Sequence, residues 1–332
     1  MQKLLIIFLS LYAIIYALYF VYTLFHVTYN RKEFSKQDLS DGPLVLKEGM
    51  IVGKKHTGNL KSSKISTNKK EKHKEQTFVF NSFIDVAKKI AKAKHLLYFT
   101  LVNGDFERLT LNWLCNTSIF KNLHDLVLIV STSKSLCEHV QWNFGDNLTC
   151  IFFNFPGYDE HLDWGKQKYI DFLTMRAQLA MTLIRNSIRF VLIEVDSTWF
   201  QDPLELFLNT TVFKDVDILV PSNGYIHRKD LLAFSPMLVK PTNTSLVLFN
   251  EINRLLRKND SLYDQDVLNK LCSVQYGGVI CRNFEYSDIA DGKWFYLKDK
   301  EKVNMHPFIV NNNFYVGVRN KETRQYLRNV HI

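Results

Sequence analysis

The sequence has few cysteines, and no two of them are closely spaced. Only five occur among 332 residues, and none forms a CxxC pair. This scarcity argues against a structural zinc site, which usually draws its ligands from such pairs. Five cysteines agree with an oxidising compartment and leave one of them unpaired. Disulfides Cys137–Cys150 and Cys272–Cys281 would close short loops, although spacing alone does not decide the connectivity.

Outside one segment, the sequence also lacks a strong charge of either sign, and no internal repeat is visible. The formal net charge is +9, and residues 54–76 supply +6 of it through eight lysines and two glutamates. This segment is polar and poor in hydrophobic residues, which is typical of a solvated spacer. Because the rest of the chain is nearly balanced, a basic groove for nucleic acid is not expected.

A long apolar run near the N-terminus is sufficient to span a bilayer. Leu4–Phe25 contains 22 uncharged residues, and aromatic residues crowd its C-terminal half. The run exceeds the usual core of a signal peptide and no small-x-small cleavage site follows it cleanly. We therefore expect a signal-anchor, with a cleaved signal peptide as the alternative. Five N-x-[ST] sequons follow the run, at Asn116, Asn147, Asn209, Asn243 and Asn259. Their position favours a lumenal domain and hence a single-pass type II protein of the Golgi or endoplasmic reticulum membrane.

The chain divides into four zones on these grounds. We expect a cytosolic tip at residues 1–3, the anchor at 4–25, a Lys-rich stem at 26–76 and a globular lumenal domain at 77–332. In the last zone, buried strands are predicted at His95–Val102, Leu126–Thr132, Leu148–Phe155, Arg189–Val195 and Val216–Ser222. Helices are predicted at Asn81–Ala93, Glu107–Leu114 and Gln167–Asn186. Strands that alternate with helices predict an α/β fold with a largely parallel sheet.

Two carboxylates follow one of the predicted strands. In "FVLIEVDSTWFQDPLELF" an apolar run leads to Glu194 and Asp196, at the strand end where ligands of open α/β sheets gather. If the strand persists, both side chains lie on the same side of the sheet and repel each other. A hard divalent metal would neutralise them and keep coordination positions for phosphate oxygens. The alternative is a solvated strand end, with Asp202 and Pro203 starting the next helix.

This stretch resembles the metal-binding segment of the nucleotide-diphospho-sugar transferase family, which has an apolar strand, a D-x-D, a Trp and a D-P. The corresponding residues are Glu194, Asp196, Trp199, Asp202 and Pro203. Three further segments follow in the family's order, so that the similarity covers about Leu96 to Lys321; they are Asn103–Thr117, Val239–Asn269 and Pro307–Lys321. The resemblance implies a GT-A glycosyltransferase domain that uses Mn²⁺ or Mg²⁺ and a nucleotide-diphosphate sugar, in particular a UDP-sugar.

The sequence departs from the family pattern at three places. Glu194 stands where the family has its first Asp, and Asn311 aligns with the closing His. The family's central acceptor segment, of N-G-G-F type, is replaced by one that carries Ser235 and Pro236. These departures favour an alternative to the enzyme, namely a catalytically inactive lumenal descendant that binds sugar nucleotides or glycans. A tethered module whose polybasic stem binds anionic partners is a third possibility.

The resemblance implies metal-ligand roles for Glu194, Asp196 and Asn311, and donor contacts for Asp196 and Glu194 as well. It places Asp264, Gln265 and Asp266 against the transferred sugar. One of these two carboxylates would be the general base if the reaction inverts the anomeric centre. The resemblance favours retention, for which no dedicated protein base is obvious. Asp264 as a helix N-cap is the alternative.

Five other donor-binding candidates follow. Arg176 falls on the apolar stripe of its predicted helix and needs a partner there, either the donor or a neighbouring acid. Lys321, with Gly317 and Asn313, is interpreted as a clamp for the donor phosphates, and a solvated lysine is the alternative. Asn103 follows the first strand and contacts the nucleotide base or is a simple turn residue. The predicted reaction moves a sugar to a hydroxyl of a glycan or glycoprotein.

Overall fold

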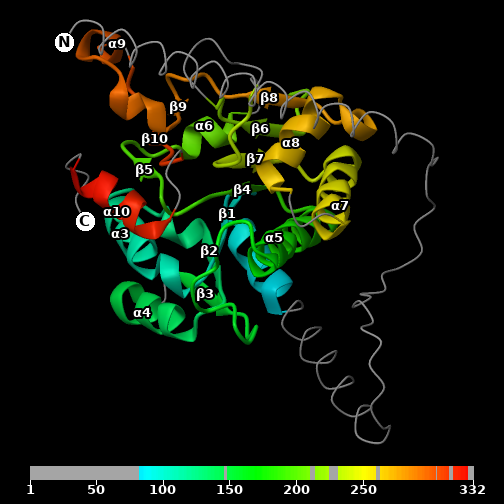
Figure 1. Cartoon of the computed structure of the whole chain (residues 1–332), viewed down its shortest axis with the longest axis horizontal. Coiled ribbons are helices and arrows are strands. Elements are labelled where there is room, and N and C mark those ends of the chain that lie inside the picture. Colours follow the sequence, from blue (N-terminus) through cyan, green and yellow to red (C-terminus); the bar gives the residue numbers. More distant parts are fainter. Residues whose placement is uncertain are drawn as a thin grey trace, which may run out of the picture. The chain divides into compact units, whose positions relative to one another are not determined.

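The computed structural model describes residues 82–145, 148–209, 214–223, 231–258, 262–303, 305–313 and 317–327 (Figure 1). The predicted tip, anchor and stem lie outside these residues, as do the sequons at Asn147 and Asn259. Among the residues that the structure describes, no helix is long and apolar enough to cross a membrane.

A seven-stranded sheet forms the centre of the domain, in the order β3-β2-β1-β4-β7-β6-β8 (Figure 1). β1 pairs in parallel with β2 and β4, whereas β7 runs antiparallel to both of its neighbours, β4 and β6. The strands are β1 Leu97–Val102, β2 Val127–Ser131, β3 Thr149–Phe152, β4 Phe190–Leu192, β6 Ile218–Val220, β7 Met237–Val239 and β8 Cys281–Asn283. The predicted α/β fold with a largely parallel sheet is confirmed.

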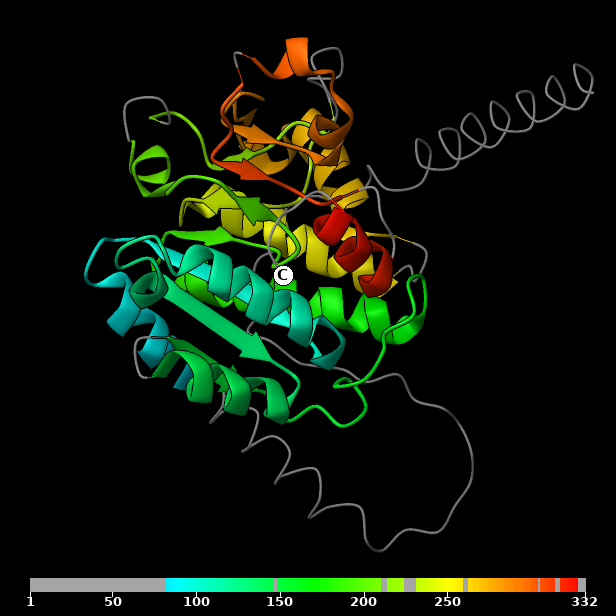
Figure 2. The same ribbon diagram turned by 90° about the vertical axis from the view of Figure 1, so that its left-hand side faces the viewer.

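Helices cover both faces of this sheet (Figures 1 and 2). One face packs against a helix over residues 82–91 and against α5 Gln167–Arg185, α7 Asn243–Lys258 and α8 Asp264–Ser273. The other packs against α3 Glu107–Thr117, α4 Lys134–Phe144 and α6 Leu204–Leu208. The short helices are η1 Gly104–Phe106, η2 His124–Leu126, η4 Tyr276–Gly278, η5 Gly292–Tyr296 and α9 Asp299–Lys302.

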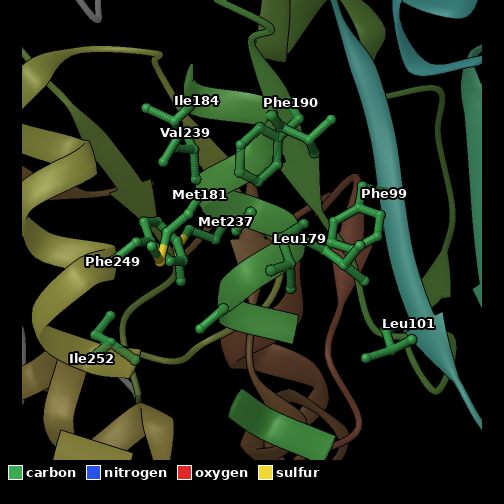
Figure 3. Packing of buried hydrophobic residues seen from close by; sticks show 14 of the residues in the cluster. Phe99, Leu101, Leu179, Met181, Ile184, Phe190, Met237, Val239, Phe249 and Ile252 are labelled. Carbon is green, nitrogen blue, oxygen red and sulfur yellow. The ribbon is translucent and has the colours of Figure 1, made fainter. Parts of the chain in front are cut away.

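The hydrophobic core has two halves, one on each face of the sheet, because successive side chains of β1 point to opposite faces. Phe99 and Leu101 join the cluster beneath α5 and α7, which Figure 3 shows from close by. Tyr98 and Val102 point to the opposite cluster beneath α3 and α4. Since a central parallel strand is covered on both faces, it is apolar at nearly every position, which is why these strands could be predicted from continuous hydrophobic runs.

A second, three-stranded sheet holds the C-terminal part of the domain in place. It has the order β5-β10-β9, formed by Thr198–Trp199, Ile309–Val310 and Ile289–Ala290. Trp199 is buried and packs edge-on against Tyr98 and Trp113, with ring centroids 5.6 and 5.3 Å away. The last helix, α10 Val318–Leu327, lies beside α3, where Glu322 pairs with Arg108 at 3.4 Å (Figures 1 and 2).

Among the described residues, the structure corrects the end of one predicted strand and contains five strands that were not predicted: β5, β7, β8, β9 and β10. The strand predicted at Arg189–Val195 ends at Leu192, because the chain turns at Glu194–Ser197. β7 was not expected at all. Its three residues, Met237–Val239, lie between two nearby prolines. A run this short gives no periodicity from which a strand could be predicted.

Both short-loop disulfides are present in the structure. Cys137 is bonded to Cys150 and Cys272 to Cys281, whereas Cys115 is free and exposed. The second of these bonds joins the C-terminal end of α8 to β8, across nine residues of sequence separation.

Removing this second disulfide should destabilise the domain measurably. For the Cys272→Ser/Cys281→Ser double variant we expect a loss of about 2–3 kcal/mol of unfolding free energy, because the cross-link restricts the unfolded chain. Chemical denaturation followed by circular dichroism measures it. Cys115→Ser is the matched control and should unfold like the parent protein. An unchanged midpoint for the double variant would show that the bond contributes nothing.

Candidate active site

Glu194 and Asp196 lie in a tight turn that directly follows β4. The backbone N–H and the hydroxyl of Ser197 both donate to the Glu194 carbonyl, at 3.3 and 2.9 Å. Asp196 is buried, whereas about a third of the Glu194 side chain is exposed. The two carboxylates are therefore presented by a turn at the carboxyl end of the strand, and not by the alternation of a strand face.

Arg176 of α5 connects one of these carboxylates to the start of α8. Its Nη1 donates to Glu194 at 3.0 Å, and its Nη2 forms an ion pair with Asp264. The guanidinium also lies over the ring of Phe234, 4.3 Å from its centroid. Burial works against the charged form, but attraction to Asp264 and Glu194 prevails and raises the pKa of Arg176 above its usual value. Arg176, a cation on the apolar face of its helix, therefore has two acids as its partners.

Lys321 of α10 forms an ion pair with Asp196. Its side chain is largely buried, so it is not a solvated C-terminal lysine. Burial opposes its charge, yet the attraction of Asp196 and Glu194 raises the pKa of Lys321. The ammonium also lies near the ring of Phe106, at 5.8 Å from its centroid. Lys321 therefore stays protonated at neutral pH.

The five side chains form one cluster with a small net charge. Burial raises the pKa of Glu194; Arg176 counteracts this rise, and Asp196 adds to it. Three carboxylates (Glu194, Asp196, Asp264) face two cations (Arg176, Lys321), which leaves a formal charge of −1 when all are ionised. The cluster alone therefore has no surplus of positive charge with which to bind a diphosphate.

Oxygen atoms suited to a hard metal ion gather beside Asp196. Pairing of β10 with β5 brings Asn311 and Asn312 next to the turn that carries Asp196. Asn311 donates to the carbonyl of Ser235 at 2.6 Å, and the Ser235 hydroxyl accepts from the Glu194 N–H at 2.8 Å. The buried side-chain oxygens of Asn311 and Asn312 accept no hydrogen bond within the described part of the chain.

Carboxylate and amide oxygens are ligands that Mg²⁺ and Mn²⁺ accept, so Asp196, Glu194 and Asn311 fit such an ion chemically. Over the described ranges, no three His, Cys, Asp or Glu side chains are grouped as metal ligands would be. An ion at this place would therefore depend on two carboxylates and an amide oxygen.

The Asp264-Gln265-Asp266 segment opens α8. The N-cap of this helix is Tyr263, so Asp264 is its first residue and not its cap. Asp264 accepts from the N–H of Gln265 at 3.0 Å in addition to its bond with Arg176. Asp266 is exposed. Partial desolvation is the main cause that raises the pKa of Asp266, and the nearby charge of Asp264 is the smaller one. The segment thus offers one neutralised carboxylate and one that faces solvent.

The remaining predicted residues contact other parts of the domain. Asn103 is buried after β1 and donates to the Glu160 carbonyl at 2.9 Å. Asn313 accepts from the N–H of Gly292 at 2.8 Å. Gly317 is exposed before α10 with φ +87°, a conformation that favours glycine. Of these three, Gly317 is bonded to a member of the charged cluster, because its carbonyl accepts from the backbone N–H of Lys321 at 3.3 Å.

Sequence reasoning did not identify Phe234, Ser235 and Asn312 as neighbours of the site. Phe234 and Ser235 belong to the segment that departs from the family's acceptor pattern, and no periodicity distinguishes them. Asn312 lies within a run of three asparagines, Asn311–Asn313, which was a detectable polar signal in an otherwise apolar stretch.

Comparison with known proteins identifies the family. Residues 122–325, well over half of the chain, match the model of the nucleotide-diphospho-sugar transferases. The chain therefore belongs to the nucleotide-diphospho-sugar transferase family and is a glycosyltransferase. A comparison with curated proteins gives no match.

Several solved glycosyltransferase structures are similar to this chain at low sequence identity. The crystal structure of mouse xyloside xylosyltransferase 1 in its apo form is 11% identical with a TM-score of 0.45, over 67% of this chain and 99% of that one. The apo glycosyltransferase GlyE of Streptococcus pneumoniae TIGR4 is 12% identical with a TM-score of 0.40, over 70% and 60%. A glycosyltransferase involved in glycosylation of the major capsid of PBCV-1 is 9% identical with a TM-score of 0.39, over 69% and 99%.

Proposed function

We propose that this protein transfers a sugar from a UDP-linked donor to a hydroxyl group of a glycan or glycoprotein. The observation that carries the proposal is the charged cluster at the carboxyl end of β4. Two carboxylates of an E-x-D segment meet a lysine and an arginine there, in a chain that belongs to a sugar-nucleotide-dependent family. Ligands of α/β sheets bind at this edge.

The charge of the cluster supports the use of a divalent metal ion. A nucleotide diphosphate is an anion, and the cluster itself carries a formal charge of −1. Asp196, Glu194 and Asn311 would hold Mn²⁺ or Mg²⁺, which would supply positive charge to the diphosphate as it leaves the sugar. Lys321 would add its ammonium on the same side, because it forms an ion pair with Asp196.

The acids at the start of α8 would act on the sugar. Arg176 holds Asp264 and Glu194 in fixed positions, so that their free lone pairs can accept hydrogen bonds from hydroxyl groups. Asp266 is exposed and has a raised pKa. If the reaction inverts the anomeric centre, Asp266 is the better candidate for the general base, because Asp264 is already neutralised by Arg176.

The proposed location is the lumen of the Golgi or endoplasmic reticulum, with the protein anchored as a type II membrane protein by Leu4–Phe25. The long apolar run and the sequons that follow it support this topology. Asn209 and Asn243 are exposed, as acceptors of N-glycans need to be in the finished protein. The two disulfides agree with an oxidising compartment.

Thermal unfolding of the full chain with a panel of nucleotide-diphosphate sugars tests donor and metal together. We expect one UDP-sugar to raise the unfolding temperature, and to raise it more when Mn²⁺ is present, because a ligand that binds only the folded state stabilises it. A panel without any shift, with or without Mn²⁺, would contradict the proposal.

A second candidate is a non-catalytic protein that binds sugar nucleotides. The specific observation in its favour is that both carboxylates of the E-x-D segment are already paired with cations, Glu194 with Arg176 and Asp196 with Lys321. Donor binding without any release of nucleotide diphosphate would select this candidate over the enzyme.

A further inference from the structure

An exposed aromatic stack borders the charged cluster. The ring of Trp164 lies parallel to that of Tyr263, with centroids 4.3 Å apart and planes 9° apart. Trp164 nevertheless remains 57% exposed, so that much of its indole faces solvent. A large aromatic side chain that is fixed on one side and open on the other offers a flat apolar surface to a ligand.

The stack is built into the fold by the loop that precedes α5. Gly165 has φ +79°, and a Cβ at this position would come within 3.0 Å of the Tyr263 hydroxyl oxygen. A glycine next to Trp164 therefore allows the loop to approach Tyr263 closely. The same loop is tied to the ends of the first two strands, since Gly104 donates to the Asp159 carbonyl at 3.0 Å and Thr132 to the Tyr158 carbonyl at 2.6 Å.

Contacts at the start of α8 connect the stack to the cluster. Tyr263 immediately precedes Asp264, and its ring lies 6.4 Å from that of Tyr169. Tyr169 is close enough to Asp264 and Arg176 for both to influence its phenol. The exposed carboxylate of Asp266 belongs to the same first turn of α8. An aromatic platform and an acid thus stand side by side at the border of the candidate active site.

We propose that Trp164 and Tyr263 form the acceptor subsite, on which a neutral sugar ring stacks while Asp266 accepts hydrogen bonds from its hydroxyl groups. This inference rests on the proposed glycosyltransferase function. The C–H face of a pyranose is apolar and fits an aromatic plane, and its hydroxyl groups are donors that match a carboxylate.

A nucleobase also stacks on aromatic rings, but the charges here disfavour it. Asp266, which has no cation as its partner within the described part of the chain, places negative charge beside Tyr263, and like charges disfavour the diphosphate that accompanies every donor base. Lys321, on α10, meets the cluster from a different element. The charges thus assign the diphosphate to Lys321 and a neutral sugar to the platform.

Ligand-observed NMR on the purified full chain tests the proposal, with UDP and Mn²⁺ present. The probes are the methyl glycosides of xylose, glucose, galactose and N-acetylglucosamine. We expect saturable binding of at least one of them, weakened about 10-fold by Trp164→Ala and partly retained by Trp164→Phe. Trp142→Ala is the matched control, because Trp142 is 87% exposed on α4 and should leave the affinity unchanged. Thermal unfolding verifies that each variant is folded.

Three results would overturn the inference. The parent protein binds none of the glycosides, or the Trp164→Ala variant binds a glycoside as tightly as the parent protein does. In the third, Trp164→Ala weakens the binding of UDP and not that of a glycoside. Donor binding by the parent protein without any effect of Trp164 on glycosides would contradict the acceptor subsite and leave the proposed function standing. Glycoside binding that depends on Trp164, in a protein that binds no nucleotide sugar, would support the sugar-binding platform and contradict the proposed function.

Discussion

Asp196→Asn should lower the release of nucleotide diphosphate from the donor by at least ~100-fold, the size of effect seen when one electrostatic stabiliser of a transition state is removed. The substitution keeps the shape of the side chain but removes its charge. It therefore takes away both a proposed metal ligand and the partner of Lys321. Mass-spectrometric detection of UDP measures the rate.

The matched control is Asp202→Asn, six residues further along the same segment. Asp202 accepts from the N–H of Leu204 at 3.0 Å just before α6, and the side-chain oxygen of asparagine can accept the same hydrogen bond. We expect near-parental turnover from it. Because Asp196→Asn also leaves a buried ammonium without its partner, its thermal unfolding must be recorded at the assay temperature. A folded Asp196→Asn variant with parental turnover would contradict the assigned role.

Arg176→Met should destabilise the domain by about 3–5 kcal/mol, because it leaves two carboxylates without their counter-charge in a largely buried place. Glu194 and Asp264 both depend on this guanidinium, which also packs over Phe234. Denaturant unfolding measures the loss. Turnover should fall as well, because the acids proposed to contact the sugar lose their fixed positions.

Arg254→Met is the control for Arg176→Met. Arg254 pairs with Glu251 one turn earlier on α7, and its side chain is half exposed. Exposed pairs of this kind contribute about 1 kcal/mol or less. The double variant Arg176→Met/Asp264→Asn should recover part of the stability, because it removes one of the unpaired charges. Equal losses of unfolding free energy for Arg176→Met and Arg254→Met would show that the buried cluster stabilises the domain no more than an exposed ion pair does.

The sheet could be predicted from sequence where burial on both faces left a continuous apolar run. This condition holds for β1 and β2, whose residues are almost all buried. It fails at the end of β4, because Ile193 and Val195 stay buried although the chain has already turned. The turn depends on hydrogen bonds from Ser197 to the Glu194 carbonyl, and a hydrophobic pattern does not contain them.

The members of the charged cluster could be named from sequence, but not their partners. The E-x-D segment, the D-Q-D segment and the closing Lys were recognised by their order along the chain. The pairing of Lys321 with Asp196 spans 125 residues, and that of Arg176 with Asp264 spans 88. Contacts this distant follow from the packing of α5, α8 and α10 around the sheet, which spacing along the chain does not encode. The stack of Trp164 on Tyr263 was missed for the same reason.

The most direct test of the whole account is the release of nucleotide diphosphate by the purified full chain. The protein is incubated with Mn²⁺ and a panel of nucleotide-diphosphate sugars, with and without the methyl glycosides. The account predicts release from at least one UDP-sugar, lost in Asp196→Asn and kept in Asp202→Asn. No release from any donor, or equal release by the two variants, would contradict a glycosyltransferase site centred on Asp196.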